Sequence, residues 1–142
     1  MITQLLIACL LMAVSVTIHA SGLAWALKRL RRSRVAALGS YRASLRMFIL
    51  IAVWIVLLHL AEISVWAVSF TWDHALPNIE TALYFSAVTY TTTGYGDVVL
   101  PQGWRLQGGV EALTGILMCG WSTGFFFAVV NRLSEARSGA AT

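Results

Sequence analysis

The sequence has very little charge. Only 11% of its 142 residues are charged, whereas 58% are hydrophobic and the mean hydropathy is +0.76. A soluble domain usually has about a quarter of its residues charged. This composition therefore excludes an ordinary soluble protein and indicates a membrane protein, and at this length we expect a single domain.

Cysteines and catalytic motifs are also scarce. The two cysteines, Cys9 and Cys119, each lie in an apolar run. We interpret them as small core residues, which excludes a disulfide framework or a cysteine metal site. The chain has no nucleophile–base set, no phosphate-binding loop and no metal-ligand spacing. We therefore expect no enzyme activity and no cofactor.

The basic residues are few but clustered. Nine of the ten fall within 28–46 or 132–137, which accounts for the net charge of +4. Clusters beside hydrophobic spans set membrane topology, so they do not indicate nucleic acid as a partner. The cluster after the first apolar run is Lys28, Arg29, Arg31, Arg32 and Arg34. We expect it to set topology, to bind anionic lipid headgroups, or to do both.

Three apolar runs exceed the roughly 20 residues that span a bilayer. The predicted transmembrane helices are 1–27, 47–72 and 106–130, with a basic cytoplasmic connection at 28–45 and a cytoplasmic tail at 133–142. The first run has no basic start and is too long for a cleaved signal peptide. The positive-inside rule then places the N-terminus outside the cell membrane and the C-terminus in the cytoplasm. Trp66 and Trp72 suit the outer interface.

Residues 78–91 are apolar and aromatic but too few to cross a membrane. Asn78 can cap a helix, and Glu80 would lie in its first turn. Such a helix is about 20 Å long at 1.5 Å per residue. We expect it to enter the membrane and stop where the polar, glycine-rich residues 92–97 begin. A loop at that depth is tolerated only when it is buried in protein or lines a water-filled path.

Residues 82–97, ALYFSAVTYTTTGYGD, closely resemble the pore helix and signature of potassium channels. The filter of that family consists of four T-V-G-Y-G loops. The resemblance covers 46–132 and implies an all-α membrane protein. Its parts would be three transmembrane helices, a re-entrant pore helix and a selectivity-filter loop. Because the chain holds one such loop, the resemblance implies a homotetramer that conducts K⁺ passively. The alternatives are a weakly selective cation channel and a non-conducting membrane assembly subunit.

The resemblance also implies a role for each residue of the loop. The filter residues would be Thr92, Thr93, Gly94, Tyr95 and Gly96. The first four would bind K⁺ through their carbonyls, together with the Thr92 hydroxyl, while the two glycines permit the required backbone angles. Tyr95 would pack against the pore helix. Asp97 would lie at the outer mouth and concentrate cations.

Two positions depart from the family pattern. Thr93 stands where valine is usual, and its hydroxyl can alter packing behind the filter. Val88 stands where some relatives carry a glutamate that partners the mouth aspartate. We therefore expect Asp97 to lack that partner, which leaves the effect on selectivity and inactivation open.

Several other residues have two readings. Gly115, Gly120 and Gly124 in the last span predict either a hinge or close helix packing. Glu111 either contacts the back of the pore helix or lies in a partly wet first turn.

The remaining ionisable residues lie in the first two spans. His59 and Glu62 are three residues apart on one helical face and form either a pH-sensing or a structural pair. We interpret His19 as a buried polar contact rather than a metal ligand.

Overall fold

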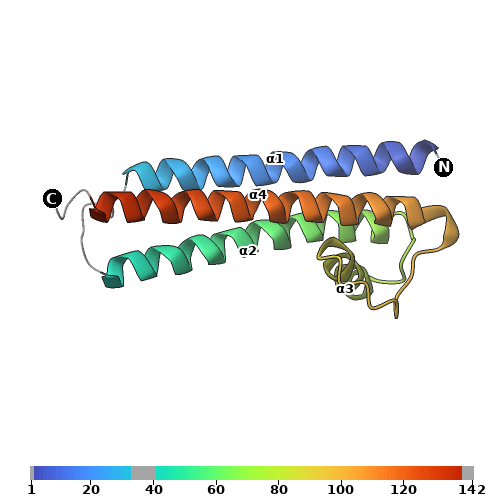
Figure 1. Ribbon diagram of the computed structural model, residues 1–142. Helices are drawn as coiled ribbons and strands as arrows, with labels where there is room; N and C mark the ends of the chain where they lie inside the picture. Colours follow the sequence, from blue (N-terminus) through green and yellow to red (C-terminus); the bar gives the residue numbers. More distant parts are fainter. Residues whose placement is uncertain (1, 33–40, 139–142) are drawn as a thin grey trace.

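All regular secondary structure is helical in the part of the protein that the structure, a computed structural model, describes, which is residues 2–32 and 41–138. The elements are α1 (Ile2–Arg32), α2 (Tyr41–Trp72), α3 (Ile79–Tyr90), the short 3₁₀ helix η2 (Gln102–Trp104) and α4 (Arg105–Ser138) (Figure 1). The predicted all-α fold is confirmed.

Three of these helices are long and apolar enough to cross a membrane, namely those at Ile2–Arg32, Arg42–Trp72 and Gln102–Arg132. In Figure 1, α1 and α4 run in the same direction and α2 runs in the opposite one. The short helix α3 lies at the end of the bundle where α2 finishes and α4 begins. The chain is therefore a multi-pass membrane protein with one helix that does not cross.

The long helices extend further than predicted. α1 continues through the basic residues to Arg32, α2 begins at Tyr41 instead of 47, and α4 runs on to Ser138 through most of the predicted tail. Arginine and lysine are good helix formers, and their long side chains can reach water beyond the apolar core. The basic segments therefore continue the helices, while Arg34 and residues 139–142 lie outside the described residues.

The start and end of α3 follow from local sequence. The Asn78 side chain accepts a hydrogen bond from the Thr81 amide at 2.8 Å and caps the helix, as predicted. At the other end, the Thr91 amide donates to the Ala87 carbonyl at 3.1 Å. At 1.5 Å per residue, the helix is about 18 Å long. This is well short of the roughly 30 Å hydrocarbon core of a bilayer.

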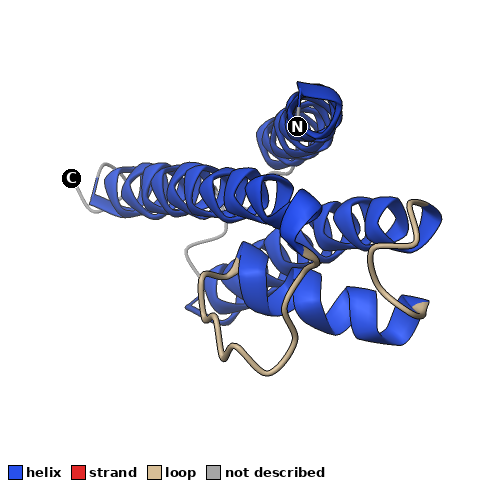
Figure 2. Cartoon of the chain, turned by 90° about the vertical axis from the view of Figure 1, so that its right-hand side faces the viewer, coloured by secondary structure: helices blue, strands red, loops and turns tan. Residues whose placement is uncertain are grey.

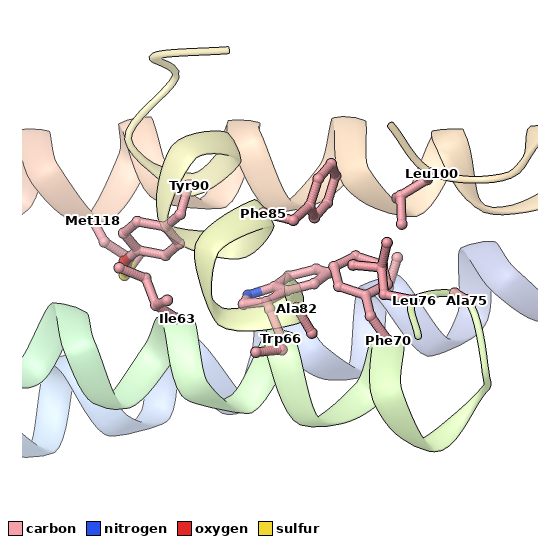
Figure 3. Packing of buried hydrophobic residues seen from close by; sticks show 12 residues of the cluster. Ile63, Trp66, Phe70, Ala75, Leu76, Ala82, Phe85, Tyr90, Leu100 and Met118 are labelled. Carbon is pink, nitrogen blue, oxygen red and sulfur yellow. The ribbon is translucent and has the colours of Figure 1, made fainter. Parts of the chain in front are cut away.

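A core of large side chains holds α3 against α2 and α4 (Figure 3). Phe70 of α2 and Phe85 of α3 meet edge to face, with ring centroids 5.4 Å apart. Tyr90, the last residue of α3, packs against Met118 of α4, and both are fully buried. The position of α3, and of the loop that follows it, is therefore set by packing on two of the long helices.

Two expectations about individual side chains are wrong. Trp66 is fully buried, and its indole nitrogen donates to Ser15 of α1 at 3.2 Å. It therefore ties α1 to α2, whereas Trp72 is 82% exposed and fits an interfacial position. Cys9 and Cys119 are free and exposed, not core residues, because each points away from the packed faces of its helix.

Candidate functional site

The loop 92–97 leaves the end of α3 with an unusual backbone. The φ angles of Thr92, Gly94 and Gly96 are +60°, +58° and +78°. Left-handed angles at every second residue turn the intervening peptide groups in a repeated way, and glycine adopts them without strain. Thr92 has a Cβ, so its left-handed angle is strained. Residues in such strained conformations cluster at functional sites. Figure 2, a view onto this end of the molecule, shows the loops that join α3 to its neighbours.

The backbone donors at the start of the loop bind the end of α3. The Thr92 amide donates to the Thr89 carbonyl at 2.9 Å, and the amides of Thr93 and Gly94 donate to the Val88 carbonyl at 2.9 and 3.3 Å. Among the loop and turn backbone hydrogen bonds of the described residues, none is accepted by a carbonyl of residues 92–95. The loop therefore has its first three amide donors fixed on α3 and the carbonyls of residues 92–95 free of these hydrogen bonds. Free carbonyls can replace the water around a cation.

The Thr93 hydroxyl is turned toward α3. It lies 3.0 Å from the Thr91 hydroxyl, which in turn donates to the Ala87 carbonyl at 2.7 Å. The departure from valine at this position therefore adds a hydrogen bond behind the loop.

Asp97, at the far end of the loop, has a partner that the sequence did not suggest. The Tyr84 hydroxyl donates to its carboxylate at 2.6 Å. This hydrogen bond lowers the pKa of Asp97 below its usual 3.8 and raises the pKa of Tyr84 above its usual 10.0. Val88 offers no such contact, but a partner is present one turn earlier on α3. The loop is thus attached to α3 at both ends.

Tyr95 does not pack against α3 of its own chain. Its side chain is 72% exposed, and all residues from 91 to 97 are exposed. The expected contact with the pore helix is therefore absent within one chain, because the loop lies on the surface of the described residues.

The three glycines of α4 are not equivalent. A Cβ at Gly115 would overlap the Tyr90 carbonyl oxygen, so this glycine allows α4 to touch the backbone at the end of α3. At Gly120 and Gly124 a Cβ would meet nothing within 4 Å. The packing interpretation therefore holds for Gly115, while a hinge at the other two stays a prediction.

Glu111 is fully buried, so the partly wet first turn is wrong for it. The Ser86 hydroxyl on α3 is close to its carboxyl group but not in hydrogen-bonding geometry, and neither carboxyl oxygen has a partner among the described residues. The contact with the back of α3 is therefore the reading that the structure favours.

Five polar side chains from four helices meet next to the end of α3. They are His19 of α1, His59 and Glu62 of α2, Tyr90 of α3 and Ser122 of α4. The sequence spacing predicted the pair of His59 and Glu62 but not its contact with His19, and it did not point to Tyr90 or Ser122. The available signal was that ionisable residues in two apolar spans are costly unless they meet partners.

The basic end of the molecule carries a groove between α1 and α2. Its volume is about 910 Å³, and it is lined by apolar side chains together with Arg29, Arg42 and Arg46. Of the described residues among those expected to bind lipid headgroups, which are Lys28, Arg29, Arg31 and Arg32, only Arg29 lines this groove. The two arginines from the start of α2 were not part of that expectation.

A comparison with family models matches residues 46–132 to the family described as "Ion channel". The matched segment contains nearly all of α2, the whole of α3 and the loop, and most of α4. No curated protein and no solved structure matches the chain. With more than half of its length in the match, the chain belongs to the ion channel family.

Proposed function

We propose that the protein is a potassium-selective channel subunit that conducts K⁺ passively through a homotetramer, without catalysis or a cofactor. The observation that carries the proposal is the loop 92–97, with its free carbonyls and alternating left-handed angles after a helix too short to cross the membrane. A polar loop at that depth needs a water-filled path or a protein environment.

Selectivity for K⁺ rests on the carbonyls of Thr92, Thr93, Gly94 and Tyr95 and on the Thr92 hydroxyl. Rings of carbonyl oxygens replace the hydration shell of K⁺ in filters of this type. Thr93 directs its hydroxyl at Thr91, behind the loop. Its side chain therefore leaves the carbonyl row unchanged, which favours selective over weakly selective conduction.

Four chains are needed because one loop supplies one quarter of each ring. In a tetramer, Tyr95 would pack against α3 of the neighbouring subunit, which accounts for its exposure in one chain. The ion channel family implies assembly of several chains in a membrane.

The orientation follows from charge. In Figure 1 the basic ends of α1, α2 and α4 lie together, opposite the end with α3. The positive-inside rule places the basic end in the cytoplasm and the mouth residue Asp97 outside a cell membrane. Anionic lipids would bind Arg29, Arg42 and Arg46 at the groove between α1 and α2.

The test is flux in vesicles that contain the purified protein, with K⁺ and Na⁺ compared. We expect K⁺ to pass far faster than Na⁺, and Gly94→Ala to abolish selective flux because φ at this position is +58°. The matched control is Gly109→Ala on the exposed side of α4, where a Cβ meets nothing within 4 Å. Equal fluxes of both ions would identify a weakly selective channel, and no flux from assembled protein would identify an assembly subunit.

A further inference from the structure

The five-residue polar cluster of His19, His59, Glu62, Tyr90 and Ser122 lies among apolar side chains. His19, Glu62 and Tyr90 are fully buried, Ser122 is 5% exposed, and the His59 side chain is 17% exposed. Polar groups in such a place are costly unless every one is paired. The cluster also belongs to no part of the loop described above.

The contacts of the cluster form a closed circuit. His19 Nδ1 lies 2.8 Å from the Glu62 carboxylate, which also accepts a hydrogen bond from the Tyr90 hydroxyl. The Tyr90 oxygen lies 3.2 Å from His59 Nδ1. The Ser122 hydroxyl then joins the Nε2 atoms of His19 and His59, at 3.0 and 3.2 Å. Each of the five side chains thus takes part in two contacts.

Hydrogen counting shows what such a circuit requires. Five contacts need five hydrogens, and the two neutral imidazoles, the phenol and the serine hydroxyl supply four. The fifth is the proton shared between Glu62 and the histidines, so the complete circuit is electrically neutral. Four donor groups follow one another along one side of the circuit, each in contact with the next. They are His19 Nδ1, the Glu62 carboxylate, the Tyr90 oxygen and His59 Nδ1.

We propose that these four donors form a binding site for a divalent transition metal ion of the Zn²⁺ type. Two imidazole nitrogens and a carboxylate are ligands that such ions accept in tetrahedral sites. We assign the fourth position to the Tyr90 phenol oxygen, which contacts the Glu62 carboxylate. One donor atom from each of His19, His59 and Glu62 lies within 4.8 Å of the other two. Zinc–ligand bonds of about 2.0–2.1 Å place tetrahedral donors about 3.4 Å apart. The distance of 2.8 Å between His19 Nδ1 and Glu62 Oε1 and that of 3.8 Å between His59 Nδ1 and Glu62 Oε2 lie on either side of that value, so the two carboxylate oxygens each face one imidazole.

Charge and the surrounding hydrogen bonds fit the same ion. Metal at both Nδ1 atoms leaves a hydrogen on each Nε2, and the Ser122 oxygen has two lone pairs to accept them. Metal ligands of this kind are held by such second contacts. A bound cation also draws the proton from a coordinating group, here Tyr90. One divalent ion then replaces two protons, those of the Glu62–histidine pair and of Tyr90, and the buried cluster stays neutral.

A metal ion in this position would join α1 to the residue that ends α3. Only Thr91 separates Tyr90 from the loop 92–97, while His19 lies on the helix outside the matched family segment. The site would therefore fix the first helix relative to the start of the loop.

The test uses the assembled protein in lipid nanodiscs, stripped of metal and free of any affinity tag. Co²⁺ is titrated in and followed by its tetrahedral visible absorption, with Zn²⁺ as competitor and metal analysis for stoichiometry. We expect one ion per chain. His19→Gln and Glu62→Gln should each weaken binding by about 100-fold or more, and Ser122→Ala by about 10- to 100-fold.

The third histidine provides the control. His74 lies in an exposed turn at φ +53°, which asparagine tolerates, so His74→Asn should bind Co²⁺ like the wild type. X-ray absorption of the Zn²⁺-loaded wild type should count two imidazole ligands, a result that does not depend on the folding of any variant. A folded wild type that takes up neither ion, or binding that survives His19→Gln and Glu62→Gln, would overturn the proposal, as would loss of binding in His74→Asn alone.

Discussion

At the scale of single residues, the hydrogen bond from Tyr84 to Asp97 is the contact that fixes the C-terminal end of the loop. It lowers the pKa of Asp97, so its stabilising effect is fully present above the usual value of 3.8 and is lost as the pH falls through the lowered value. It also raises the pKa of Tyr84 above 10.0, so the donor keeps its proton up to alkaline pH. The contact therefore persists over the whole neutral range.

Replacing Tyr84 by phenylalanine removes this donor and keeps the aromatic ring. We expect Tyr84→Phe to raise the pKa of Asp97 toward its usual value. The loss of K⁺ flux on acidification should then begin at a higher pH than in the wild type. The measurement is vesicle flux across an acidic pH series, with Tyr41→Phe at the start of α2 as a control for loss of a tyrosine hydroxyl. Identical acid profiles for wild type and Tyr84→Phe would show that the contact does not govern the loop.

Local features of this region could be predicted from sequence, and long-range pairs could not. The Asn78 cap depends on residues three apart, so it was visible in the sequence. The Tyr84–Asp97 pair depends on how the loop folds back over α3. The five-residue polar cluster depends on the relative rotation of four helices, which hydropathy does not determine.

At the scale of elements, the contact of α4 with the end of α3 depends on Gly115. A Cβ here would overlap the Tyr90 carbonyl, a backbone atom that cannot rotate away. We expect Gly115→Ala to separate the two helices and to destabilise the protein by about 1–3 kcal/mol, as overpacking does. K⁺ flux should also fall, because only Thr91 separates Tyr90 from the loop.

The matched control for this prediction is Gly120→Ala on the same helix. Its Cβ meets nothing within 4 Å, and alanine favours an exposed helix by about 1 kcal/mol over glycine. Thermal unfolding in detergent compares the two variants, and Gly115→Ala should unfold at the lower temperature. Equal unfolding temperatures would mean that α3 and α4 are not tightly packed at this position.

Element identity was predictable here, but element length was not. The sequence has three apolar runs long enough to cross a bilayer and one that is too short, and these correspond to the three long helices and α3. They could be told apart because a transmembrane helix needs about 20 apolar residues. α1 and α4 end, and α2 begins, in basic segments. The hydropathy of these segments is low, but their arginine and lysine residues are good helix formers.

At the scale of the whole molecule, α1 packs against the other helices through a narrow row of buried residues. Its buried residues are Ala8, Ser15, His19, Gly22 and Leu23. Three of them hydrogen-bond to side chains of α2: Ser15 to Trp66, His19 to Glu62, and the Gly22 carbonyl to Trp54. The loop, in contrast, is left exposed in one chain. The described residues therefore pack into one helical unit that leaves the loop uncovered.

The number of chains that share one conduction path can be tested by mixing. If four loops form one filter and a single Gly94→Ala chain disables it, equal co-expression with wild type leaves about one sixteenth of the channels intact, since all four chains must be wild type. We therefore expect vesicle flux to fall to about that fraction, whereas a two-chain path would retain about a quarter. Co-expression with Gly109→Ala, which changes no contact within 4 Å, should leave flux unchanged. A fall to only about half would mean that each chain conducts alone, because independent chains lose activity in proportion to their number.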